Sequence, residues 1–91
     1  MLFDLHGTRI PVFWMKGMRF PLDIVWIGED RRVAEVTANI PPQPGAADVD
    51  LARISPAAPV RYVLELNAGA AGRQGIAVGT QLAFDLLPPA P

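Results

Sequence analysis

The sequence from Leu22 to Ile40, LDIVWIGEDRRVAEVTANI, decides the fold of this chain. Its first six residues are rich in β-branched and aromatic side chains, which favour a strand, and only Asp23 interrupts their apolar character. The residues GEDR at 28–31 are a turn signal, and 32–40 then alternate between polar and apolar. These segments predict an antiparallel β-hairpin whose first strand is central and covered on both faces.

Short elements are predicted on both sides of the hairpin. Strands are expected at residues 2–5, 12–16, 60–66 and 81–87, and a short helix at 68–74. Asn67 is expected to cap the start of this helix and Gly75 to end it. Within the hairpin, alternation places Val33, Glu35 and Thr37 on one face. About six short strands with one helix give a mainly β fold class, a small roll or barrel-like domain.

Residues 41–59, PPQPGAADVDLARISPAAP, contain five prolines and no steady period. They predict a proline-rich surface loop that is longer than most connections in a compact domain. Such a loop is either functional, for example an interface arm, or an insertion tolerated because long loops cost little. Residues 88–91, PPAP, are expected to form a tail.

Bulk composition restricts the class of protein. Ninety-one residues, 51% hydrophobic and 19% charged, are typical of one globular domain over 1–91. The net charge is −1 and the basic residues are scattered, so no nucleic-acid partner is expected. The chain has no cysteine and His6 is its only histidine, so neither a metal nor another cofactor is predicted. No apolar run reaches the ~18 residues of a membrane span, and without a signal peptide a cytoplasmic location is expected for the chain as written.

The polar residues of FWMKGMRFPLDIVWI, residues 13–27, are the candidates for a site. Lys16 is the only lysine against seven arginines, which reflects either a need for a compact ammonium or chance. Asp23 lies in a strand built for burial, where a carboxylate must be paired or hydrogen-bonded. It is expected either to accept backbone N–H bonds or pair with Lys16 or Arg19, or to act on a ligand. Trp14 is expected in the core or lining a groove, and Trp26 in the core.

Several motifs in order resemble a known family. The segments FWMKGMRFPLDIVWI, VAEVTANIPP and APVRYVLELNAGAAGRQGIAVGTQLAF are similar to the bacterial and archaeal domain-of-unknown-function 192 family. The resemblance implies a small, mostly β, barrel-like domain with short helices and no established reaction. The family pattern falls on Trp14, Met15, Lys16, Pro21, Leu22, Asp23, Tyr62, Glu65 and Gly75.

This chain also departs from the family pattern. Members commonly have asparagine where this chain has Gly17, and often two cysteines in the proline-rich loop. They usually carry several tens of residues before the segment that matches Met1, including a strand and often an export signal. We therefore expect an unpaired sheet edge, through which a homodimer could form by edge pairing or strand exchange.

Three functions are compatible with these residues. The first is a binding or accessory module in which a groove of Trp14, Lys16, Arg19, Asp23, Tyr62 and Glu65 takes a small polar ligand or a protein segment. The second is a small hydrolase or lyase with Asp23 or Glu65 as general base and Lys16 or Arg19 stabilising an anion. The third is a purely structural or interaction domain.

Overall fold

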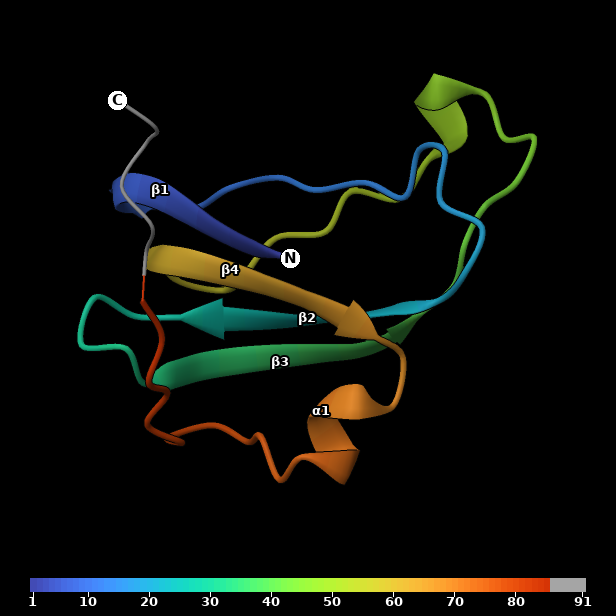
Figure 1. The fold of residues 1–91 in the computed structure, drawn as a ribbon. Coiled ribbons are helices and arrows are strands. Elements are labelled where there is room, and N and C mark those ends of the chain that lie inside the picture. The colour runs from blue at the N-terminus through green and yellow to red at the C-terminus, as the bar shows by residue number, and fades with distance from the viewer. Residues whose placement is uncertain (86–91) are drawn as a thin grey trace, which may run out of the picture.

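The computed structural model describes residues 1–85, whose arrangement is shown in Figure 1. Its elements are β1 (Leu2–Arg9), β2 (Leu22–Ile27), β3 (Val33–Ile40), the 3₁₀ turn η1 (Asp48–Asp50), β4 (Val60–Asn67) and α1 (Ala70–Arg73). The strands form one antiparallel sheet in the order β1-β4-β2-β3. The mainly β class and the single short α-helix are confirmed. The sheet is open, and the expected tail at 88–91 lies outside the described residues.

Within residues 1–85, two predicted strands are reduced to single bridges and four strands remain. The last two positions of the strand predicted at 81–87 lie outside the described residues. Phe13 pairs with Ile54, and Arg32 pairs with Gln81. Toward Pro11 the first ladder cannot extend, because its next hydrogen-bonded pair there is Pro11 with Pro56 and neither has an N–H to donate. In the other direction the Ala52 N–H bonds to the Gln43 side chain instead.

The predicted hairpin is confirmed, and β2 lies at the centre of the sheet as expected. All six β2 residues are buried. Ile24 and Trp26 belong to the first hydrophobic cluster, on one face of the sheet, and Val25 and Ile27 belong to the second cluster, on the other face. In Figure 1, α1 lies below the strands and η1 lies away from them at the upper right, and α1 contacts β2 and β4. Because both faces are covered, β2 is apolar at nearly every position.

The expected shared face of β3 is wrong at one residue. Val33 lies opposite Ile27 and packs in the second cluster, whereas Glu35 lies opposite Trp26 of the first cluster. The register shifts between Trp26 and Ile27. An extra residue in a bulge moves the following side chains to the opposite face, which strict alternation does not anticipate.

Candidate functional site

Among residues 1–85, Asp23 is the one charged residue in the buried core, with 1% of its surface exposed. Its Oδ1 accepts a hydrogen bond from the Asn39 N–H at 2.9 Å. Its Oδ2 accepts bonds from the N–H groups of Gly69 at 3.0 Å and Ala71 at 3.1 Å. The carboxylate therefore joins the end of β3 and the start of α1 to the central strand.

This arrangement replaces the expected helix cap. The N-cap of α1 is Gly69, at a φ of 87°, and no side chain of the helix caps it. The expected cap at Asn67 is therefore wrong, because the first N–H groups of the helix are satisfied by Asp23 from another strand. Gly75 follows the helix at a φ of 69°, as predicted for a left-handed C-terminal glycine.

The geometry of Asp23 bears on its chemistry. A general base must come within hydrogen-bond reach of the proton that it removes. The Asp23 carboxylate is enclosed and already accepts three backbone bonds. The expected ion-pair partners of Asp23 are Lys16 and Arg19. Lys16 pairs with Asp48 instead, and within residues 1–85 neither cation forms an ion pair with Asp23. These three hydrogen bonds, which we call the Asp23 latch, hold β3 and α1 to β2 inside the fold.

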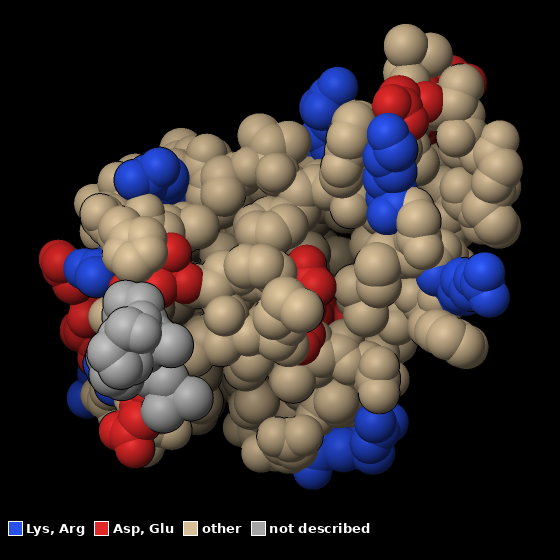
Figure 2. All heavy atoms as spheres, turned by 45° about the horizontal axis from the view of Figure 1, so that its top comes forward, with Lys and Arg blue, Asp and Glu red and all other residues tan. Residues whose placement is uncertain are grey.

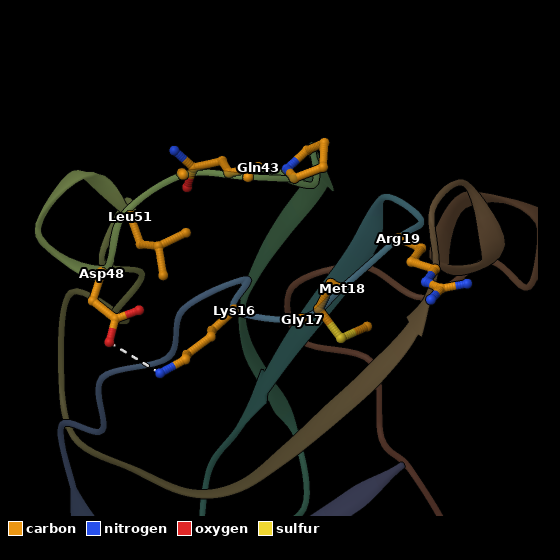
Figure 3. Close-up of a pocket in the computed structure, with 10 residues that line it drawn as sticks. Lys16, Gly17, Met18, Arg19, Gln43, Asp48 and Leu51 are labelled. Carbon is orange, nitrogen blue, oxygen red and sulfur yellow. Dashed lines mark hydrogen bonds and ion pairs between the residues drawn. The ribbon is translucent and has the colours of Figure 1, made fainter.

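Lys16 lies on the surface beside Trp14. Its Nζ is 2.9 Å from Oδ2 of Asp48, with both side chains 55% exposed. The dashed line in Figure 3 marks this pair. The Lys16 Nζ also lies 5.4 Å from the centre of the Trp14 ring, and the Arg53 guanidinium carbon lies at the same distance. Trp14 is 39% exposed, so its ring is a partly open surface flanked by two cations.

A cleft of about 340 Å³ runs between the turn at residues 16–19 and the proline-rich loop. Figure 3 shows its lining residues, with Lys16 reaching toward Asp48. The turn is closed by a hydrogen bond from the Met18 N–H to the Met15 carbonyl, and Gly17 adopts a φ of 74° within it. The cleft is lined by Lys16, Gly17, Met18, Arg19, Gln43, Pro44, Gly45, Ala46, Asp48 and Leu51.

The proline-rich loop is held by its own contacts. The Gln43 side chain donates to the Asp50 carbonyl at 3.2 Å and accepts from the Ala52 N–H at 2.8 Å. Leu51 is 6% exposed, and Glu35 accepts a hydrogen bond from the Ala57 N–H at 2.8 Å. The wall of the cleft therefore does not depend on the Lys16–Asp48 pair.

The remaining candidate residues are dispersed. Arg19 lines the cleft, but its side chain points away from the Lys16–Asp48 pair in Figure 3. Tyr62 is buried in the second cluster, on the opposite face of the sheet from the first cluster. Glu65 lies opposite Ile24 in the register, on the face of the first cluster. Of the six candidates, Lys16 and Arg19 line the cleft, and Trp14 lies beside Lys16 without lining it.

Sequence reasoning missed Asp48, Arg53 and Gln43, because they lie in a segment without periodicity. Asp48 and Arg53 contact Lys16 and Trp14 from more than thirty positions away. A single sequence carries no signal for such distant pairs. The only local indication was the length of the loop.

A second charged group lies where β1 pairs with β4, outside the cleft. Arg61 Nε is 2.8 Å from Asp4 Oδ1, and Arg61 Nη1 is 3.2 Å from Glu29 Oε1. The hydrogen bond from Arg61, with a second from the His6 backbone N–H, lowers the pKa of Asp4 to about 2. The hydrogen bond to Asp4 raises the pKa of Arg61 in turn. These charges support the strand pairing of β1 with β4.

Residues 1–85 also bear on three other kinds of feature: a basic surface, a metal site and a membrane-spanning helix. In Figure 2, Lys and Arg lie in separate places, several of them beside Asp or Glu, and they form no continuous basic stripe on that face. Across residues 1–85, no group of three or more His, Asp or Glu side chains is placed to hold a metal ion. In the same part of the chain, no helix has the length and apolarity needed to cross a membrane.

Comparison with known proteins places the chain in a family. The profile of DUF192, described as Uncharacterized ACR, matches residues 1–84. A solved protein of Sinorhizobium meliloti 1021, named as a candidate transcription regulator, is 39% identical with a TM-score of 0.73, over 87% of this chain and 57% of that one. A Novosphingobium aromaticivorans DSM 12444 protein of unknown function is 38% identical with a TM-score of 0.74, over 87% of this chain and 52% of that one.

The chain thus spans somewhat more than half the length of either solved protein. A search of curated proteins finds no match. The profile match covers nearly the whole chain, and the resemblance seen in the sequence is confirmed by it. The chain belongs to the DUF192 family.

Proposed function

We propose that this chain is a binding module whose site is the cleft between the 16–19 turn and the proline-rich loop. The ligand carries a carboxylate or another anionic group, on a small polar molecule or on a protein segment. Lys16 binds that group, and the exposed ring of Trp14 contacts the apolar part beside it. Asp23 acts as a structural latch, and Tyr62 and Glu65 lie apart from the site.

One observation carries this proposal: the Lys16 ammonium lies at the cleft beside an exposed tryptophan, and Asp48, its carboxylate partner, is itself exposed. An exposed ion pair contributes only about 0–1 kcal/mol, so a ligand anion can replace Asp48 at little cost. A cation next to an open aromatic ring in a concave site is a common arrangement for recognising an amphipathic ligand.

The Sinorhizobium protein is named as a candidate transcription regulator, but the charges of this chain do not favour a DNA contact. Its basic side chains are scattered on the face shown in Figure 2. Binding to DNA needs several cations to neutralise neighbouring phosphates. We therefore do not extend that role to this chain.

The test is a thermal-shift titration with succinate, inorganic phosphate and short capped aspartate peptides. An anion at a hundred times its dissociation constant stabilises the native state by about 2.7 kcal/mol. At roughly 4–8 °C per kcal/mol for a domain of this size, the melting temperature should rise by about 10 °C or more. Lys16→Met should abolish the rise.

Arg73→Gln is the matched control, because Arg73 is an exposed cation at the end of α1, far from the cleft lining. It should keep the full response. The proposal is overturned if no anion raises the melting temperature, or if Lys16→Met responds as the wild type does.

We also propose that the protein self-associates through a sheet edge. In support, the sheet is open and β1 and β3 are its edge strands. Hydrogen bonds from the 79–80 turn cover β3 only at Val33. Light scattering with size-exclusion chromatography at high micromolar concentration should give the mass of a dimer, and a monodisperse monomer would refute this second proposal.

A further inference from the structure

The segment before Lys16 presents a row of exposed apolar side chains. Ile10 is 51% exposed, Val12 58% and Trp14 39%, whereas Phe13 packs against the first cluster and Met15 is buried in it. Exposure at every second residue is typical of an extended segment with one face in solvent. Large apolar side chains grouped in this way indicate an interaction surface.

The backbone of the same segment is open on one side. The N–H and the carbonyl of Phe13 both bond to Ile54, each at 2.8 Å. In an extended chain the groups of neighbouring residues point the opposite way, so those of Val12 and Trp14 face away from Ile54. Within residues 1–85, neither Val12 nor Trp14 makes a backbone hydrogen bond. The segment is therefore a short strand edge that can accept another strand.

The charge at the end of this edge selects the ligand. Lys16 lies two residues after Trp14, beyond the buried Met15, and the Arg53 guanidinium lies over the same Trp14 ring. The carboxylate that pairs with Lys16 comes from Asp48, in a turn of the proline-rich loop. Hydrogen bonds from the Gln43 side chain hold this turn without help from Lys16. The sequence of that turn, Asp48-Val49-Asp50, alternates acidic and aliphatic residues, and Val49 is 89% exposed.

We propose that an extended acidic peptide adds as a strand along residues 10–14 and places a carboxylate on Lys16, displacing Asp48. This inference rests on the proposed function for its assignment of Lys16. The peptide's backbone pairs with Val12 and Trp14, and its apolar side chains cover the exposed row. The row from Ile10 to Trp14 is about 13 Å long, at ~3.3 Å per residue. This is longer than a small dicarboxylate, and it matches the length of an extended peptide.

The test uses a dye-labelled, capped peptide of alternating aspartate and valine, followed by fluorescence anisotropy at low salt. Asp48→Asn should tighten binding about two- to fivefold, because it removes an exposed competing carboxylate. Val12→Ser should weaken binding several-fold, and a peptide with asparagine in place of aspartate should not bind. Asp50→Asn is the matched control for Asp48, because the Asp50 contact to Gln43 is through its backbone carbonyl.

Strand addition has a distinct signature in the peptide backbone. A strand uses the N–H groups of alternate residues to pair with one neighbour. Methylating one alternate set of peptide nitrogens should abolish binding, whereas methylating the other set should leave it intact. Equal binding by both methylated peptides would overturn the inference.

The outcomes separate this inference from the proposed function. If Lys16→Met abolishes binding but Asp48→Asn binds as the wild type does, displacement is refuted and the cleft remains the site. If Lys16→Met binds normally, both proposals fail. If Val12→Ser converts a dimer to a monomer and the peptide never binds, a second copy occupies this edge and the peptide inference is overturned.

Discussion

Replacing Asp23 with asparagine tests the internal latch most severely. Oδ1 of an asparagine can accept the two bonds from Gly69 and Ala71, but its NH₂ group then faces the Asn39 N–H, which loses its acceptor. An unsatisfied buried donor costs about 1–3 kcal/mol, and two bonds that lose their charge cost about 1 kcal/mol each. Because asparagine is neutral, the variant does not have to bury a charge, and this offsets part of the cost. We expect a loss of about 3 kcal/mol in the free energy of unfolding.

Urea unfolding followed by tryptophan fluorescence measures this loss, since Trp26 is fully buried and reports on the core. With roughly 4–8 °C per kcal/mol, the melting temperature should fall by about 12–24 °C. Asp50→Asn is the exposed control and should stay within about 0.5 kcal/mol of the wild type. An Asp23→Asn variant within 1 kcal/mol of the wild type would refute the reasoning.

Three further changes test other contacts. Thr37→Val should cost about 1–2 kcal/mol in urea unfolding, because Thr37 Oγ1 accepts the Trp26 Nε1–H at 2.9 Å, whereas Thr37→Ser should cost less. Asp4 has a lowered pKa in the folded state, so its contribution to stability is present above pH about 4 and lost as the pH falls toward about 2. Asp4→Asn should flatten the pH dependence of the melting temperature in that window, and an unchanged slope would contradict the Arg61 contact. Gln43→Ala should speed amide exchange in residues 44–52 by about tenfold or more, with the global free energy of unfolding nearly unchanged. An unchanged exchange rate would contradict the role of Gln43 in holding the loop.

The sequence predicted the central hairpin because β2 is apolar on both faces and a turn signal separates it from β3. It also indicated that Asp23 must be satisfied internally, since a strand built for burial cannot hold a bare carboxylate. Its partners could not be predicted, because Asn39, Gly69 and Ala71 donate backbone N–H groups, which every residue type except proline carries.

The candidate site was predicted less completely. Trp14 and Lys16 were identified from composition and position, and the structure places them side by side. Asp48 and Arg53 complete the group from the proline-rich loop, which has no period that could fix its path. The end of the Phe13 ladder on the Pro11 side could have been anticipated from Pro11 and Pro56, once the pairing of Phe13 with Ile54 was known.

The most direct test of the binding site is a ¹H–¹⁵N NMR titration of the whole chain with the aspartate–valine peptide. We predict saturable shifts at the backbone amides of Val12, Trp14 and Lys16 and at the Trp14 indole, with a smaller shift at Asp48. The Trp26 indole and the Asn39 amide, which lie inside the fold, should stay in place. No saturable shift, or shifts confined to the opposite face around α1, would contradict the assignment of this edge and cleft as the binding site.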